Sequence, residues 1–60
     1  MNKVQLAREI YWLSRDLGII KGFSTEGQFI HGCLNGCGAL KPQSKSDLEA
    51  WYEQLQNRVQ

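Results

Sequence analysis

His31, Cys33 and Cys37 are the residues whose types and spacing come nearest to a metal site. They follow the order H-x-C-x3-C, and the 60-residue chain contains no further His or Cys. A structural zinc site takes four ligands, typically from paired Cys and His residues, so the fourth ligand is missing. The spacing also matches none of the common zinc signatures. We therefore predict two reduced thiols in a glycine-rich region, with no bound metal or other cofactor.

The same region offers little for catalysis. Residues two apart on a helix face different directions, so His31 would not point at Cys33, and no third group is available to orient the imidazole. Glu49 and Glu53 are spaced i, i+4, but they lie on the solvent face of a predicted helix. The glycines are not followed by the Lys-Ser/Thr pair of a phosphate-binding loop. We predict that the chain is not an enzyme.

Charge is balanced and scattered along one short domain, residues 1–60. Seven Lys and Arg residues accompany six Asp and Glu residues, which gives a formal net charge of +1. Nucleic-acid-binding domains usually carry a basic face, because phosphate contacts dominate their affinity, and no run of like charge is present.

Arg8 and Glu9 interrupt the first apolar stretch, so it is neither a signal sequence nor a membrane span. We expect a cytoplasmic protein without a membrane partner, whose thiols stay reduced.

Residues 2–17 have the periodicity of an amphipathic helix. At about 100° per residue, four apolar side chains fall within one narrow arc. Gly18 follows at the position where a residue in the left-handed conformation commonly ends a helix. The four apolar residues are Leu6, Ile10, Leu13 and Leu17. We expect this arc to pack against the rest of the domain.

A second apolar stripe runs along the same helix, about 120° from the first. It consists of Val4, Ala7 and Tyr11, and Trp12 lies on the polar arc next to it. Trp and Tyr are enriched at interface hot spots, so we predict that these four residues bind a partner. Small domains are often stabilised by a second copy of the chain, and the stripe predicts a homodimer centred on Ala7. In the alternative, residues 19–40 cover the stripe and leave a monomer with Trp12 exposed.

Residues 47–59 form the other long predicted helix. Ser46 and Glu49 fit a capping box, S-x-x-E, in which each side chain accepts a hydrogen bond from the backbone N–H of the other residue. A single apolar stripe runs along this helix. The stripe consists of Leu48, Trp51, Tyr52, Leu55 and Val59. We expect the first and last helices to pack through their apolar stripes, with Trp51 and Leu55 in the core.

The middle segment, residues 21–41, contains five of the six glycines. Thr25 and Gln28 fit another capping box, which predicts a short helix over Thr25–Leu34 with Asn35-Gly36 as its C-cap. In the alternative, Asn35-Gly36 is a hairpin turn and the chain is α-β-β-α. The apolar residues of this segment follow helical spacing better than alternation, so the helix is favoured.

These elements predict an all-α fold, a small three-helix domain with a glycine-rich middle segment. For function, we predict a regulator or inhibitor that acts by protein–protein contact, and its size is similar to that of small accessory proteins of phages and plasmids. The alternative is a dimeric nucleic-acid-binding transcriptional regulator built on a helix-turn-helix. It is not favoured, because the middle helix offers Glu26, Gln28 and His31 but no Arg or Lys to a nucleic acid.

Overall fold

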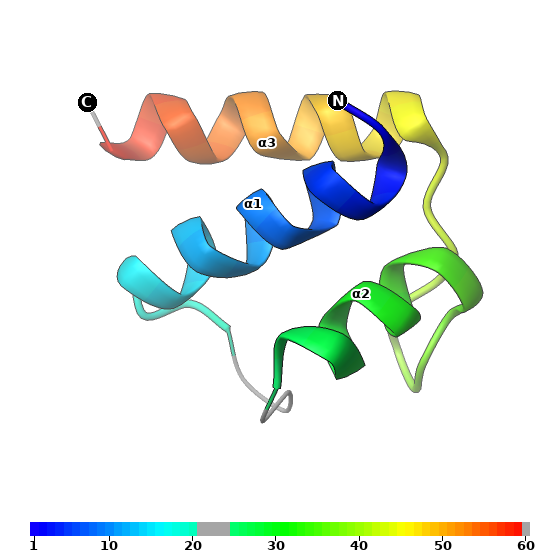
Figure 1. The fold of residues 1–60 in the computed structure, drawn as a ribbon. Coiled ribbons are helices and arrows are strands. Elements are labelled where there is room, and N and C mark those ends of the chain that lie inside the picture. The colour runs from blue at the N-terminus through cyan, green and yellow to red at the C-terminus, as the bar shows by residue number, and fades with distance from the viewer. Residues whose placement is uncertain (21–24, 60) are drawn as a thin grey trace.

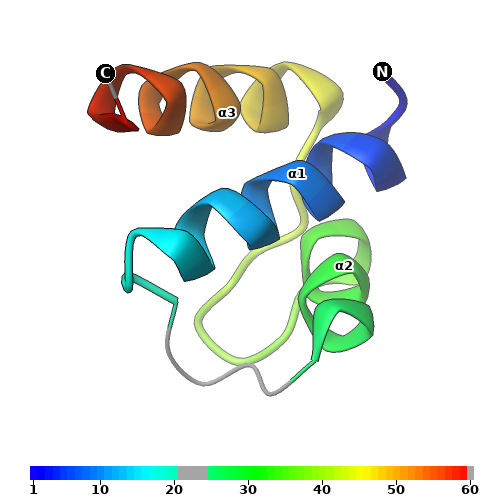
Figure 2. The same cartoon turned by 60° about the vertical axis from the view of Figure 1, so that its left-hand side comes forward.

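The computed structural model describes residues 1–20 and 25–59, and three helices account for most of them. They are α1 (Lys3–Asp16), α2 (Glu26–Asn35) and α3 (Lys45–Val59). The described part of the chain contains no strand, so the all-α prediction is confirmed. In both views of the ribbon, α1 lies between the other two helices and packs against each (Figures 1 and 2). Within the described residues, no helix has the length and apolar character needed to cross a membrane.

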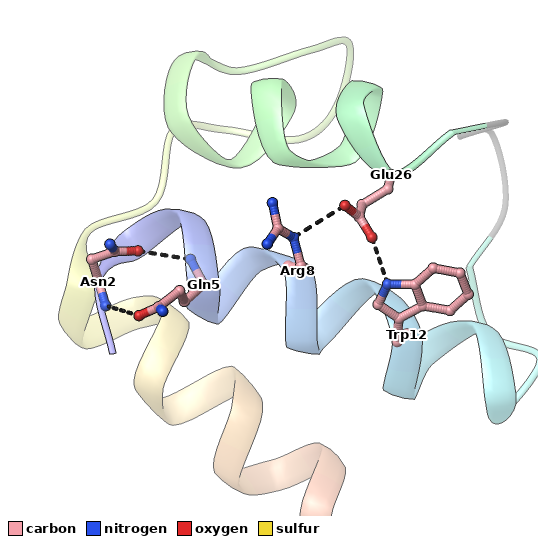
Figure 3. Close-up of polar contacts among 5 residues, drawn as sticks. All are labelled: Asn2, Gln5, Arg8, Trp12 and Glu26. Carbon is pink, nitrogen blue, oxygen red and sulfur yellow. Dashed lines mark hydrogen bonds and ion pairs between the residues drawn. The ribbon is translucent and has the colours of Figure 1, made fainter.

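Both ends of α1 are closed by local hydrogen bonds. At its start, the Gln5 N–H donates to Asn2 Oδ1 at 2.8 Å, and the Asn2 N–H donates to Gln5 Oε1 at 3.2 Å (Figure 3). This is a reciprocal capping box. At the other end Gly18 has a φ of 71°, and the Ile19 N–H donates to the Ser14 carbonyl at 3.0 Å. A bond of this span over a left-handed glycine is a Schellman ending, so the predicted stop at Gly18 is confirmed.

The middle segment forms the helix α2 and has no hairpin at Asn35-Gly36. Thr25 is the N-cap, and its hydroxyl accepts the Gln28 N–H at 3.2 Å. Gly36 ends the helix with a φ of 89°, and its N–H donates to the Gly32 carbonyl at 2.7 Å. A β-carbon at position 36 would also lie 3.0 Å from the Pro42 ring. Both the backbone conformation and the close neighbour therefore favour glycine here.

The connection from α2 to α3 is tied back onto α2. Cys37 and Leu40 exchange two backbone hydrogen bonds, of 2.8 and 2.9 Å, across a tight turn. The Gln43 N–H then donates to the Cys33 carbonyl near the end of α2 at 2.7 Å. These bonds satisfy backbone groups that a free loop would leave to water. They also fix where α3 begins relative to α2.

The start of α3 differs from the sequence prediction. The capping residues are Ser44 and Asp47, not Ser46 and Glu49. The Asp47 N–H donates to Ser44 Oγ at 3.1 Å, and the Ser44 N–H donates to Asp47 Oδ2 at 3.2 Å. The segment S-K-S-D-L-E contains two overlapping S-x-x-acid patterns. Use of the earlier pattern adds residues 45 and 46 to the helix, and the Leu48 N–H donates to the Ser44 carbonyl at 3.0 Å.

One apolar cluster holds the three helices together. Its buried members are Leu6, Ala7, Ile10, Tyr11, Phe29, Cys33, Leu48 and Leu55. The partly buried residues packed against them are Leu13, Leu17, Ile20, Ile30, Leu40, Trp51 and Tyr52. Both α1 and α3 contribute residues of their apolar stripes to this cluster, so the predicted packing of the two helices is confirmed. Leu55 is a core residue as expected, Trp51 lies at the edge of the core, and the side chain of Val59 is outside the described part.

Aromatic rings link the helices through Phe29 of α2. Its ring lies 5.8 Å from that of Tyr11 on α1 and 5.6 Å from that of Trp51 on α3, measured between centroids. Ring pairs at such distances add about 0.5–1.5 kcal/mol beyond the area that they bury. Phe29 thus brings the short middle helix into contact with both long ones.

Candidate functional site

The structure divides the four residues predicted to bind a partner into two pairs. Ala7 is fully buried and Tyr11 is 3% exposed, whereas Val4 and Trp12 are 39% and 45% exposed. Ala7 and Tyr11 belong to the core, and the Tyr11 ring contacts Phe29 of α2. Ala7 and Tyr11 therefore make their contacts within the chain. This agrees with the alternative that the sequence left open, in which residues 19–40 cover the stripe. The helix α2 covers most of the second apolar stripe, and Trp12 stays at the surface.

The dimensions of the chain are those of a compactly folded single chain of its length. A monomeric protein of 6.9 kDa is expected to expose about 4,000 Å², and this chain exposes 4079 Å². Its radius of gyration is 10.5 Å, close to the roughly 10.4 Å expected for its length. The prediction of a homodimer assumed that the second apolar stripe has no partner within the chain. Since α2 covers most of that stripe, a homodimer stays a prediction without a defined interface.

Trp12 is exposed but held on three sides. Its indole N–H donates to Glu26 Oε2 (Figure 3). The guanidinium carbon of Arg15 lies 5.4 Å from the centre of the indole ring, and the Tyr11 ring meets it edge-on at 5.4 Å. The hydrogen bond, the cation–π contact and the aromatic pair together select one orientation of the indole. Trp12 therefore presents a fixed apolar surface to the solvent.

Glu26 connects this tryptophan to the second helix. It is the first residue of α2, and its other oxygen, Oε1, accepts from Arg8 Nε at 3.1 Å. An acidic residue here also interacts favourably with the positive end of the helix dipole. The side chains of Arg8 and Glu26 are 53% and 30% exposed, so the ion pair contributes at most about 1 kcal/mol. Its main effect is positional, because one carboxylate fixes both Arg8 and Trp12.

The exposed face of α1 carries a continuous stripe of side chains around Trp12, which we call the outer stripe. It consists of Val4, Arg8, Trp12 and Arg15. Their spacings of four, four and three residues place them within an arc of about 80°. Among the described residues, the large apolar side chains that are most exposed are Met1, Val4, Trp12 and Ile19. All four come from α1 or its flanks, so exposed apolar surface is concentrated on this helix.

Sequence reasoning missed Glu26 as part of the site. The signal was present in the i, i+4 spacing of Arg8 and Trp12, because an acid that reaches one donor also reaches the other. Which acid occupies that position depends on how α2 packs on α1. That packing includes the contact of Tyr11 with Phe29 and cannot be read from a pattern within either helix.

The sulfur and imidazole groups are not brought together. Cys33 is buried in the core, whereas Cys37 and His31 are exposed. Burial raises the pKa of the Cys33 thiol to about 11, so it is protonated at neutral pH and is a poor nucleophile. In the described part of the chain, no three His, Cys, Asp or Glu residues are grouped as metal ligands would be. Reduced, metal-free thiols remain the prediction.

The helix connections do not resemble those of a helix-turn-helix. That motif joins its two helices by a turn of about three to four residues. Here α1 ends at Asp16 and α2 begins at Glu26, and nine residues, 36–44, join α2 to α3. The N-terminal end of α2, which would read bases in such a motif, instead directs Glu26 at Arg8 and Trp12 (Figure 3).

Comparison with known proteins adds no relative: no protein-family model matches the chain, and no curated protein or solved structure shows significant similarity to it.

Proposed function

We propose that this chain is a non-enzymatic regulator or inhibitor that acts by contact with another protein through the outer stripe of α1. The observation that carries the proposal is Trp12, which is 45% exposed and yet held by Glu26, Arg15 and Tyr11. Hot spots of protein interfaces are enriched in Trp and Arg. An anchor that is already ordered loses less conformational entropy on binding than a mobile one. The surface is thus suited to recognition without further rearrangement.

A binding role also agrees with the state of the other reactive groups. The Cys33 thiol is buried and the imidazole of His31 is exposed on another part of the same helix, which is unfavourable for a thiol nucleophile with a histidine base. Both cysteines are free, and free thiols are usual in the reducing cytoplasm. We propose that the protein is located there.

The proposal is tested by capturing partners from a lysate of the native host with tagged wild-type chain and with the Trp12→Ala variant. The matched control is Glu53→Ala, which shortens an exposed side chain on α3. We expect a protein that binds the wild type and the control but is lost from the Trp12 variant, while circular dichroism shows all three chains folded. Equal capture by all three would mean that the outer stripe is not the binding surface.

A further inference from the structure

The outer stripe contains hydrogen-bond donors that form no bond within the described part of the chain. Arg8 contacts Glu26 through Nε, and its two terminal nitrogens take no part in that contact (Figure 3). Arg15 lies over the Trp12 ring, and no carboxylate within residues 1–20 and 25–59 forms an ion pair with it. A guanidinium group offers five N–H donors in a planar fork that matches a carboxylate. Two such forks therefore flank a fixed, exposed indole.

We propose that the outer stripe binds an acidic peptide segment of the partner protein. In this arrangement carboxylates pair with Arg8 and Arg15, and an apolar side chain between them packs on Trp12. Glu26 already demonstrates the chemistry within the chain, because its carboxylate is bound by Arg8 and by the indole N–H at once. The inference depends on the proposed function, since it names the kind of partner that the same surface recognises.

The spacing of the two arginines specifies the segment further. Arg8 and Arg15 are seven residues apart, which corresponds to about 10.5 Å along a helix. A peptide in the polyproline II conformation advances about 3.1 Å per residue with three residues per turn, so acidic residues three positions apart lie on one side of it and would face the two guanidinium groups. The pattern that fits is acid-apolar-apolar-acid.

A peptide fits this surface better than a nucleic acid strand does. Glu26 lies at the centre of the site, and the exposed residues Glu9 and Asp16 occupy the neighbouring arc of α1. A strand carries a phosphate at every nucleotide and would meet these three carboxylates. A peptide can carry its two negative charges only where the arginines are.

The test is a titration of labelled chain with synthetic peptides, followed by nuclear magnetic resonance. The probes are the acidic peptide GSELFEGS, its charge-reversed counterpart GSKLFKGS, and an eight-nucleotide oligothymidylate. The two indole N–H signals provide an internal control, because Trp12 is in the site and Trp51 packs at the core. We expect the acidic peptide to shift the Trp12 signal and leave that of Trp51 in place.

Charge variants then test the complementarity directly. Arg15→Gln should weaken binding of the acidic peptide about two- to fivefold, the usual size of one exposed charge pair. The control Arg58→Gln, in the last turn of α3, should leave it unchanged. Glu26→Gln should strengthen binding by a similar factor, since it removes a like charge and leaves an oxygen to accept the indole N–H. If Glu26 only held Arg8 and Trp12 in place, Glu26→Gln would weaken binding of the acidic peptide instead.

The inference is overturned if the acidic peptide fails to bind, if the lysine peptide or the oligonucleotide binds more tightly, or if Arg15→Gln has no effect. These failures are distinct from failure of the proposed function. A partner that is lost with Trp12→Ala but binds Arg15→Gln with unchanged affinity would leave the binding surface in place and remove only the acidic ligand.

Discussion

Tyr11 and Trp12 are adjacent in the sequence, but Tyr11 lies in the core and Trp12 lies at the surface of the protein. Tyr11 is buried against Phe29, whereas Trp12 is nearly half exposed and is held by polar groups. The turn of about 100° between them is enough to separate the inner face of α1, which α2 and α3 cover, from the outer stripe. The inner face is ordered by packing and the outer stripe by one carboxylate and one guanidinium group. Side chains on the two faces should therefore respond differently to substitution.

The largest difference is expected when the same charge is introduced on each face. Ala7 is fully buried, so Ala7→Glu forces an unpaired carboxylate into the core at a cost of several kcal/mol. The total free energy of unfolding of a 60-residue domain is only about 3–9 kcal/mol. We expect the variant to lack a cooperative thermal transition in circular dichroism. Gln5→Glu is the control, because position 5 is exposed and Glu also completes the capping box with Asn2.

A folded Ala7→Glu variant would mean that α2 does not cover this side of α1. The homodimer predicted from the sequence, with the second stripe available to another copy of the chain, would then apply. Sedimentation equilibrium of both Glu variants would show whether an assembly larger than 6.9 kDa is present.

The second prediction compares the two neighbouring aromatic residues. Tyr11→Ala removes a buried ring and should lower the free energy of unfolding by about 3–5 kcal/mol, the range for large aromatic residues in cores. Trp12→Ala removes a half-exposed ring and one hydrogen bond, and should lower it by about 1 kcal/mol. Urea denaturation of the two variants measures both values. Equal losses would contradict the separation of α1 into a structural and a binding face.

The smallest predicted effect concerns Ser14, a polar residue on the inner face. Its hydroxyl is buried and forms no hydrogen bond with the described residues. A buried hydroxyl without a partner costs about 1–3 kcal/mol, and Ala is the better helix former. Ser14→Ala should therefore raise the free energy of unfolding by about 1 kcal/mol. The same change at Ser44 removes the N-cap of α3 and should lower it by about 1 kcal/mol. Two changes of the same sign would contradict this assignment.

Much of the fold could be predicted from local patterns. Apolar spacing indicated α1 and α3, Gly18 marked the end of α1, and Thr25 marked the start of α2, because each of these signals acts within one or two turns of the chain. The start of α3 was misplaced because two overlapping capping patterns were available, and their local chemistry is nearly the same. Local signals therefore identify elements more reliably than they choose between neighbouring boundaries.

The site was less accessible to prediction. A helical wheel places Tyr11 and Trp12 on neighbouring arcs, but which arc is covered depends on where α2 packs. The roles of Arg8 and Glu26 likewise follow from contacts between residues 18 positions apart. Tertiary contacts of this kind carry no periodic pattern. The sequence therefore indicated Val4 and Trp12, but it showed neither that Ala7 and Tyr11 are buried nor that Glu26 belongs to the site.

Site-directed photo-crosslinking tests the central claim most directly, that the outer stripe of α1 is the surface that contacts another protein. A photoreactive amino acid is placed at Asp16, which is exposed next to the stripe, and separately at Glu53, which is exposed on α3. Each chain is irradiated in cells of the native host, and the adducts are identified by mass spectrometry. The account predicts an adduct with a different protein from position 16 and none from position 53. It is contradicted if position 16 gives no adduct, gives only an adduct between two copies of this chain, or gives the same adducts as position 53.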